Sequence, residues 1–476
     1  MRMKRILLLS LSVVMFALIT GCGIVRKYVP EKSCHIGSWL PNGISEDVFE
    51  EINASNTGNP GVYSEGLISF NAAKGYRLPA SVFDISGSTS AYTHIAFEVK
   101  NENDYTLKRG SVTFLTNRAN VSVTCYSDIK KGETGIVLFP VSNFGNIRIN
   151  KLRRITILYS NHGEECVISL KDVYPVAVSV GLRKTVCEIR DPFILSENGI
   201  YYMYGTGWQY YKNTSGDING EWTGPYSMVD WNRIKELLPD YEQQCWAPEV
   251  YKYGDAYYAI TTYNSSERGG SVGTHKYDGR GTVILRAETP EGPFTKWSDG
   301  LITPDSWDCI DGTLYIDDNG QPWLFFVHEW TSTDGEGGKF ACAKLSSDLK
   351  TLISEPKDVF STGGVTDGCF IYTAANGDLL SLWSTYDDDY GYCVNVIRSK
   401  NGIDGDWQFD DLLYSSYYGN ESGGHGMLFT DTDGLMKMSF HIDSDNNYAA
   451  FINVKEENNK LVLSDLTVSE IPDQPE

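Results

Sequence analysis

Five polar or aromatic side chains recur at matching places in the second half of the chain. Each lies eight to ten residues before a glycine that opens an apolar run, and successive glycines are roughly sixty residues apart. The five side chains are those of Asp191, Trp246, Asp311, Asp367 and His425. Carboxyl groups held close together can act as general acid and general base, because their surroundings separate their pKa values. The pattern therefore predicts acid–base chemistry if the fold gathers the three carboxyl groups.

The segments that must position these side chains consist of strands and turns. The turn glycines are Gly199, Gly254, Gly320, Gly377 and Gly434. The runs that follow them, such as IYYMYGT and DLLSLWS, have the composition of strands. A repeat of this length suits a four-stranded propeller blade better than a solenoid. Five blades would place the five side chains at equivalent positions on the innermost strands, around one central funnel.

Three carboxyl groups around a funnel suit the hydrolysis of a glycosidic bond. One carboxyl group must protonate the leaving oxygen, and another must activate water or attack the anomeric carbon. A third carboxylate near the acid raises the pKa of that acid through repulsion between like charges. A single aspartate would be read as a turn or cap residue, but three at matching offsets favour a sugar-cleaving site.

The repeat region resembles glycoside hydrolase family 43, whose members are five-bladed propellers that act on arabinose- and xylose-containing plant polysaccharides. The resemblance covers nearly all of residues 185–445 and rests on short motifs. In the segment IRDPFI it implies that Asp191 is the general base. In IDGTLY it implies that Asp311 orients the acid and modulates its pKa, and in VTDG it makes Asp367 the general acid.

The same resemblance implies residues that bind the sugar. Trp246, in the segment CWAPEV, is expected to help form the sugar pocket, and His425, in GGHGMLF, is expected beneath the active site. Arg190 stands next to the expected base, and this position leaves two roles open: it either binds the substrate or serves as a counter-charge for the base. No organic or redox cofactor is implied. An ion near His425, such as a calcium in the propeller channel, is a further expectation from the resemblance.

One motif departs from the family pattern. The family's acid is typically glutamate, whereas this chain has Asp367, and Cys369 stands where proline is common. Aspartate is one methylene shorter, and positional errors near 1 Å can cost about 10²-fold in rate. Either the pocket is adapted to the shorter acid, or Glu249 or Glu329 serves instead, or the enzyme is weakened. We favour adaptation, with Asp367 as the acid.

The predicted reaction is inverting hydrolysis of α-L-arabinofuranosyl or β-D-xylosyl linkages. The expected substrates are plant cell-wall polysaccharides, arabinan or arabinoxylan, or their oligosaccharides. A retaining fructan-cleaving propeller would need an N-D-P-N nucleophile motif and a Glu-Cys acid motif, and neither stands at the expected place. The alternative from another class is a surface glycan-binding lipoprotein whose propeller has lost catalysis.

The chain is predicted to be all-β, with two domains. Residues 34–178 contain seven or more short alternating segments, which favour a β-sandwich of jelly-roll type. This first domain either binds carbohydrate or is a structural cap, and its candidate stacking rings are Trp39, Tyr63, Tyr76 and Tyr92. Residues 179–476 form the predicted propeller. Within it we expect a helix over 227–239 and long funnel-mouth loops over 265–281 and 331–339.

The N-terminus has the pattern of an export signal. A basic start, an apolar stretch and the run LITGC resemble a bacterial lipobox, so residues 1–21 would be a signal peptide and Cys22 the lipidated residue. Residues 22–33 would be a tether. Two acyl chains are enough for stable anchoring. We therefore expect an extracytoplasmic protein at the bacterial cell surface, with a plain signal peptide or a single membrane helix as the alternative.

The net charge and the cysteine spacing argue against several classes of ligand and partner. A formal net charge of −22 argues against nucleic acid and against electrostatic adhesion to anionic lipid, so contact with a membrane is expected only through the N-terminal lipid. The 10 cysteines show no CxxC spacing, which argues against a zinc site. A disulfide between Cys125 and Cys166 stays open, and the others are expected to be buried thiols.

Overall fold

The computed structural model forms two compact units, Met1–Val178 with Val468–Glu476, and Ser179–Thr467. The structure describes residues 44–79, 94–107, 112–116, 120–122, 129–140, 154–159, 165–237, 241–265, 269–273, 275–387, 391–416, 422–444, 446–465 and 467–470. The predicted signal peptide, Cys22, the tether, Trp39, Tyr92 and Cys125 lie outside these residues. Within them, no helix has the length and apolar character needed to span a membrane.

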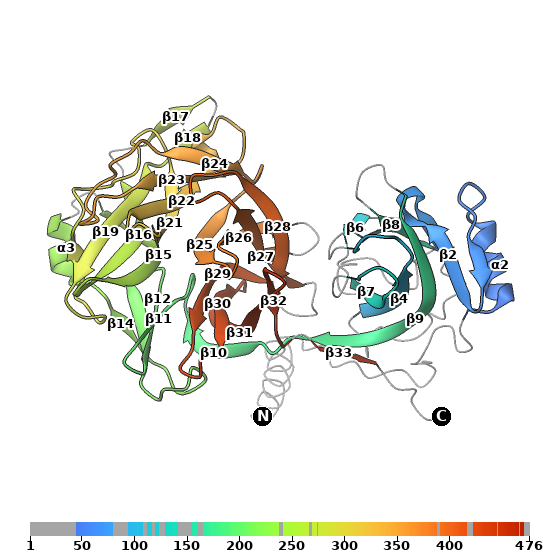
Figure 1. Cartoon of the computed structure of the whole chain (residues 1–476). Helices are drawn as coiled ribbons and strands as arrows, with labels where there is room; N and C mark the ends of the chain where they lie inside the picture. The colour runs from blue at the N-terminus through green and yellow to red at the C-terminus, as the bar shows by residue number, and fades with distance from the viewer. Residues whose placement is uncertain are drawn as a thin grey trace, which may run out of the picture. The chain divides into compact units, whose positions relative to one another are not determined.

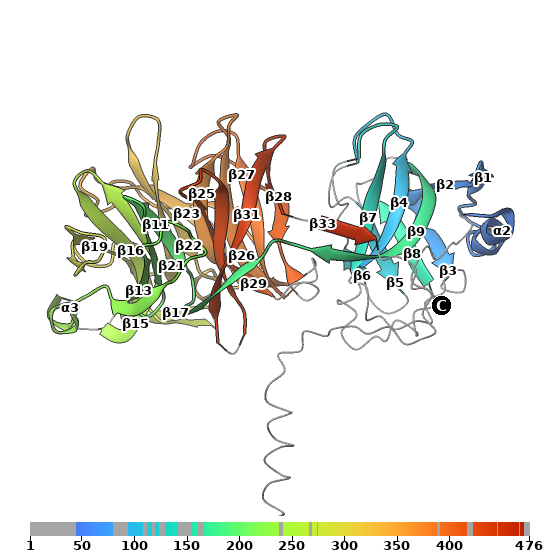
Figure 2. The same cartoon turned by 90° about the horizontal axis from the view of Figure 1, so that it is seen from below.

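The described residues of the first unit form two sheets, one α-helix and a short 3-10 helix. The larger sheet has the strand order β1 (Val62–Ser64), β2 (Leu67–Asn71), β9 (Val167–Ser179), β4 (His94–Asn101) and β7 (Thr134–Pro140). The smaller sheet has the order β3 (Tyr76–Pro79), β8 (Arg154–Tyr159), β5 (Val112–Thr116) and β6 (Asn120–Ser122). The helix α2 (Glu46–Ala54) lies beside β1 and β2 (Figure 2) and begins at Ser45, whose side chain accepts the Val48 N–H. In β8 alternate residues are buried, as the two-residue period of a strand requires.

The last described strand of the chain belongs to this first unit. Strand β33 (Thr467–Glu470) pairs with β9 (Figure 1). The structure divides the chain after Val178 and places the segment from Val468 with the first unit, whereas the sequence predicts that segment in the second domain. The reason is that an open sheet edge accepts a strand through main-chain hydrogen bonds, which leave little trace in the sequence of that strand.

The described residues of the second unit form five antiparallel sheets of four or five strands, numbered here I to V, and one two-stranded hairpin. Sheet I is β11 (Phe193–Glu197), β12 (Ile200–Gly205), β13 (Gln209–Asn213) and β14 (Thr223–Ser227). Sheet II is β15 (Tyr241–Tyr253), β16 (Ala256–Ser265), β19 (Arg280–Ala287) and β20 (Thr295–Lys296). Sheet III is β21 (Cys309–Ile316), β22 (Pro322–His328), β23 (Lys339–Lys344) and β24 (Lys357–Ser361).

The last two sheets complete the set. Sheet IV is β25 (Asp367–Thr373), β26 (Leu379–Asp387), β27 (Gly391–Ser399) and β28 (Trp407–Tyr414). Sheet V is β29 (Gly423–Thr430), β30 (Met436–Ile442), β31 (Tyr448–Glu457) and β10 (Arg183–Glu188), with β32 (Lys460–Leu463) added to β31. Sheet V therefore joins the first strand of the unit to its last strands.

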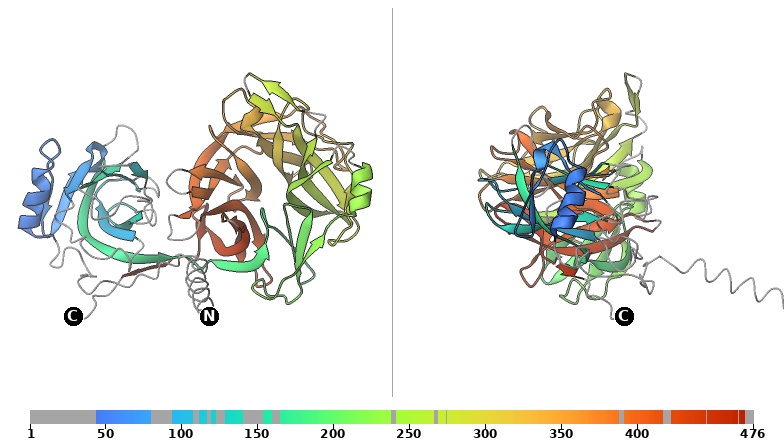
Figure 3. Two further views of the ribbon diagram at one scale, coloured as in Figure 1. Left: turned by 180° about the vertical axis from the view of Figure 1, so that it is seen from behind. Right: turned by 90° about the vertical axis from the view of Figure 1, so that its right-hand side faces the viewer.

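The first strands of the sheets form a closed ring. Strands β11, β15, β21, β25 and β29 contact one another in this order, and β29 also contacts β11. Figure 1 shows the five sheets arranged around this common centre, and Figure 3 shows the same ring from behind. The turn glycines predicted from the sequence follow these strands, with φ angles from 60° at Gly254 to 86° at Gly377, in the left-handed region that glycine adopts without strain.

The predicted helix and loops of the second unit are shorter or more ordered than expected. Helix α3 (Trp231–Leu237) covers only part of the predicted 227–239. The loop over 265–281 contains a hairpin of β17 (Gly270–Val272) and β18 (His275–Tyr277), and the short helix η5 (Trp330–Ser332) starts at the edge of the loop over 331–339. The hairpin and η5 contact each other.

All cysteines of the described residues whose state the structure gives are buried free thiols, Cys166 among them.

Candidate active site

In every sheet, a residue with left-handed backbone lies within the ring-forming strand or shortly before it. These residues are Asp191, Ala247, Asp311, Gly368 and His425, with φ angles of 55°, 43°, 53°, 60° and 56°. In sheets II to V the strand carries a bulge at this point, which inserts one extra residue and re-aims the side chains.

The bulges correct one expectation from the sequence. Asp191, Asp311 and His425 occupy equivalent positions, but Trp246 and Asp367 each lie one residue before the left-handed residue of their own sheet. The distance to the turn glycine could not reveal this offset, because it counts strand residues and bulge residues alike.

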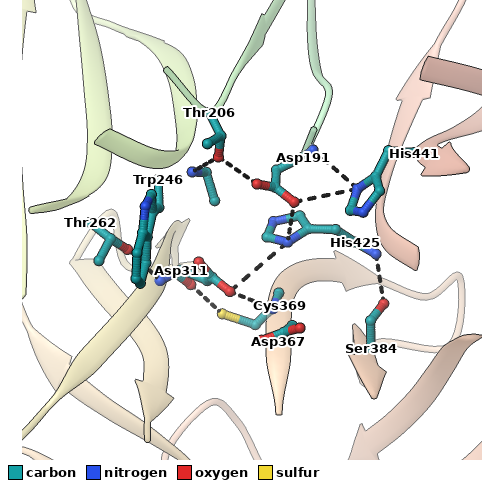
Figure 4. A network of polar contacts seen from close by, with 12 residues as sticks. Asp191, Thr206, Trp246, Thr262, Asp311, Asp367, Cys369, Ser384, His425 and His441 are labelled. Carbon is teal, nitrogen blue, oxygen red and sulfur yellow. Dashed lines mark hydrogen bonds and ion pairs between the residues drawn. The ribbon is translucent and has the colours of Figure 1, made fainter. Parts of the chain in front are cut away.

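The backbone N–H of each left-handed residue donates to a side chain from the preceding sheet. The donor and acceptor pairs are Ala247 N to Thr206 Oγ1 at 2.9 Å, Asp311 N to Thr262 Oγ1 at 2.9 Å, Gly368 N to Asp311 Oδ2 at 2.7 Å, His425 N to Ser384 Oγ at 2.7 Å and Asp191 N to His441 Nδ1 at 3.2 Å. These five hydrogen bonds fix the mutual positions of the strands that carry the site (Figure 4).

Asp191 lies in a cationic, hydrogen-bonded environment. Its side chain accepts from Thr206 Oγ1, and its Oδ1 lies 3.2 Å from His425 Nδ1 and 3.4 Å from His441 Nδ1 (Figure 4). Burial by itself would raise the pKa of Asp191, but His425 and Arg190 together with the Thr206 hydrogen bond hold it below its usual value. Asp191 is therefore ionised at neutral pH.

His441 is a site residue that the sequence reasoning missed. It is fully buried, and burial lowers its pKa to about 4, so the imidazole is neutral. Because Nδ1 accepts the Asp191 N–H, the ring proton lies on Nε2, which has no hydrogen-bond partner among the residues that the structure describes. His441 stands inside an apolar strand segment, so its sequence context gave no signal.

Asp311 and Asp367 form the protonated side of the site. Burial raises the pKa of each carboxyl group to about 7, and repulsion adds to it, from Asp191 at Asp311 and from Asp311 at Asp367. Gly368 N–H donates to Asp311 at 2.7 Å, whereas Asp367 has the longer 3.2 Å hydrogen bond from the Tyr392 hydroxyl. The backbone hydrogen bond favours the ionised form of Asp311, so the proton that the two carboxyl groups retain belongs on Asp367.

Tyr392 was also missed by the sequence reasoning. Its buried ring can lie beside the site because position 424 is glycine: a Cβ there would stand 2.4 Å from a carbon of that ring. The exposed ring of Tyr386 stacks on it, with 4.7 Å between ring centroids.

Arg190 lies close to both Asp191 and Asp367. Although burial opposes its charge, nearby Asp191, Tyr392 and Asp367 raise its pKa. The guanidinium therefore lies within electrostatic reach of the base and the acid.

The two spare carboxyl groups named from the sequence are engaged elsewhere. Glu329 Oε2 lies 2.6 Å from Arg280 Nη1, and Arg280 lies over the Trp246 ring with 4.9 Å to its centroid. Glu249 is buried and accepts from the Tyr251 hydroxyl at 2.5 Å, and burial raises its pKa to about 8. Trp246 itself is partly exposed and lies near Asp311 (Figure 4).

The described residues contain no group of three or more His, Cys, Asp or Glu side chains placed to hold a metal ion. Calcium prefers six to eight oxygen ligands, whereas the neighbours of His425 combine one carboxylate at 3.2 Å with a second at 3.9 Å. The calcium in the channel stays a prediction.

Comparisons with known proteins agree with this chemistry. Residues 187–457 match the family described as Glycosyl hydrolases family 43. A solved structure, the endo-arabinase from Bacteroides thetaiotaomicron, is 30% identical over 59% of this chain and 99% of that chain, with a TM-score of 0.49. The family match covers more than half of the chain. The ring of sheets with its three carboxyl groups is thus that of a glycoside hydrolase, and the chain belongs to glycosyl hydrolases family 43.

Two curated relatives are more distant. The extracellular exo-α-(1→5)-L-arabinofuranosidase of Cellvibrio japonicus is 25% identical over 178 residues, which are 36% of this chain and 47% of that protein. The probable arabinan endo-1,5-α-L-arabinosidase A of Aspergillus flavus is 24% identical over 262 residues, 54% of this chain and 74% of that protein. The chain thus spans about half the length of the first relative.

Proposed function

We propose that the protein hydrolyses α-L-arabinofuranosyl or β-D-xylosyl linkages of plant cell-wall glycans with inversion. The observation that carries the proposal is the opposite electrostatic setting of the three aspartates. Asp191 has a lowered pKa and suits a base that takes a proton from water. Asp311 and Asp367 have raised pKa values, and together they keep one proton for the leaving oxygen.

Asp367 is the proposed acid, and Asp311 holds it in place. Asp311 accepts the N–H of Gly368, the residue next to the acid, so its carboxylate orients the segment that carries Asp367. The engagement of Glu329 with Arg280 and of Glu249 with Tyr251 supports Asp367 over either glutamate. Arg190 and Trp246 would contact the sugar.

The wider organisation belongs to the same proposal. The five sheets and their ring of first strands support a five-bladed propeller, and the two sheets of the first unit support a jelly-roll domain. The names of the relatives favour arabinan as substrate, and the word extracellular in one of them agrees with an exported, lipid-anchored protein at the cell surface. The lipidation of Cys22 can be tested directly by mass spectrometry of the membrane-extracted protein.

Two substrates whose leaving groups differ in pKa distinguish the role of the general acid from that of the general base. 4-Nitrophenolate leaves readily without protonation, whereas a sugar alkoxide does not. Asp367→Asn should therefore lose about 10²–10⁴-fold in kcat/KM on arabino- or xylo-oligosaccharides and far less on the matching 4-nitrophenyl glycoside. Asp191→Asn should lose activity on both substrates alike. With the wild-type protein, NMR of the first product should show an inverted anomer.

Other outcomes would redirect the proposal. Equal losses on both substrates in Asp367→Asn would remove it as the acid, and the same discrimination in Glu249→Gln or Glu329→Gln would name its replacement. Binding of arabinan by the wild-type protein without any hydrolysis would establish a glycan-binding protein instead.

A further inference from the structure

One face of the Trp246 indole is covered by a guanidinium group. Arg280, the first residue of β19, places its Cζ 4.9 Å from the ring centroid. Such a cation–π contact is attractive, and it strengthens where the two groups are shielded from water. The contact restricts how the partly exposed indole can turn.

Arg280 is itself held by three carboxylates. Its Nη1 lies 2.6 Å from Glu329 Oε2 and 3.7 Å from Asp308 Oδ2, and its Nη2 donates to Asp278. The side chains of Arg280 and Glu329 are each 14% exposed. Because both Nη1 and Nη2 bind carboxylates, these contacts fix the orientation of the guanidinium plane over Trp246.

Asp308 connects this arrangement to two loop segments, around Asp278 and around Thr331. Its fully buried carboxylate accepts the backbone N–H groups of Asp278 at 3.0 Å and Arg280 at 2.9 Å, and the Thr331 hydroxyl at 2.7 Å. Its own N–H donates to Ser332 Oγ at 2.9 Å. One carboxylate therefore ties the end of the 265–281 loop to η5, the start of the 331–339 loop.

The stability of the fold does not by itself explain why Arg280 is surrounded by three carboxylates. Several charges taken out of water repay their desolvation only with good geometry, and apolar replacements are often no less stable. A rigid sugar platform does benefit, because a ring ordered before binding loses less conformational entropy when the sugar arrives.

We propose that Arg280 is a positioning residue for substrate binding, which holds the Trp246 indole in its sugar-stacking orientation, with Asp308 and Glu329 as its anchors. The inference rests on the proposed function, since it takes a saccharide as the ligand of Trp246. Sugar specificity at this side of the funnel then depends on the 278–280 segment, which lies outside the repeated motifs.

A double-mutant cycle between Arg280→Ala and Trp246→Ala tests the coupling. On the oligosaccharide that the wild type hydrolyses, Arg280→Ala should raise KM about tenfold and leave kcat nearly unchanged. The double variant should lose no more than Trp246→Ala alone, because the arginine acts through the indole. Arg280→Lys, which keeps the charge without the planar fork, should fall between wild type and Arg280→Ala.

Arg286 offers a matched control on the same strand. It lies 5.2 Å from the centroid of the Trp297 ring and pairs with Glu288 at 2.6 Å, away from the three aspartates. Arg286→Ala should leave KM unchanged. Should Arg280→Ala fail to fold, the cycle is run with Arg280→Lys.

The outcomes separate this inference from the proposed function. Multiplicative losses in the double variant, or a fall in kcat with KM unchanged, would overturn the positioning role. If the wild type hydrolyses none of the substrates, the proposed function fails, and calorimetry with arabinotriose and xylotriose replaces kinetics. Weaker binding in Arg280→Ala, matching that of Trp246→Ala, would then still support the inference, and unchanged binding would refute it.

Discussion

We expect the three aspartates to differ in role, because their neighbours differ although their side chains are the same. Two imidazoles and a hydroxyl surround Asp191, whereas Asp311 and Asp367 are buried close to other carboxylates. The base must be ionised and the acid protonated, so kcat/KM should hold through acidic pH and fall as pH rises through about 7.

Tyr392 should set the position of that basic limb. Its hydrogen bond stabilises the ionised form of Asp367 and so lowers the pKa of that carboxyl group. Tyr392→Phe should move the basic limb of the kcat/KM profile to higher pH, with KM little changed. Tyr386→Phe, which removes a hydroxyl from the stacked ring beside it, is the control and should leave the limb in place. A limb that stays put or moves downward in Tyr392→Phe would contradict the assignment.

At the scale of elements, the hydrogen bonds between sheets hold the site together. Thr262→Val would leave the buried N–H of Asp311 without its acceptor, at a cost of about 1–3 kcal/mol in the free energy of unfolding. Misplacement of Asp311 should also lower kcat. Denaturant titration and kinetics measure both effects.

Thr282 provides the control for that substitution. It is buried on β19, the strand next to the one that carries Thr262, and its hydroxyl has no partner among the residues that the structure describes. Thr282→Val should therefore be neutral or slightly stabilising. Equal destabilisation by both substitutions would mean that the Thr262 hydroxyl has no special role.

Glu249 is buried in β15 and should make stability depend on pH. Its folded-state pKa of about 8 exceeds the usual value, so the folded protein keeps a proton that the unfolded chain releases. The stability it contributes is present at low pH and is lost as pH rises towards 8. Glu249→Gln should flatten this decline by a few kcal/mol, on the scale of about 1.4 kcal/mol per pKa unit.

The measurement is guanidinium unfolding of both proteins at pH 5 and pH 8. Glu221→Gln, a change at an exposed glutamate, serves as control. A decline between the two pH values that is as steep in Glu249→Gln as in the wild type would show that other groups cause it.

At the scale of the whole molecule, the chain's end completes the unit with which it begins. Ending the chain at Asp465 would remove β33 and expose the edge of β9. Limited proteolysis should then cut faster within the first unit, while kcat on a small 4-nitrophenyl glycoside stays the same. Faster cleavage within residues 179–465 and a loss of kcat would show that the last residues serve the catalytic unit.

What the sequence determined by itself was the local chemistry. The turn glycines, the strand repeat and the types of the ring-lining residues follow from short segments, because turn geometry and strand period depend on near neighbours. The family assignment rests on those same motifs and is confirmed. Asp191, Asp311 and His425 were accordingly identified at equivalent positions.

What only the tertiary structure decided depends on contacts between distant segments. The bulges shift Trp246 and Asp367 by one residue, and His441 meets Asp191 across 250 positions of sequence. Arg280 and Glu329 are 49 positions apart in sequence, and their contact shows that Glu329, an alternative acid in the prediction from sequence, binds Arg280 instead. The pairing of β33 with β9 is of the same kind. A residue's pKa and its partners are set by what the closed fold brings within a few ångströms, and this proximity is not encoded in any single segment.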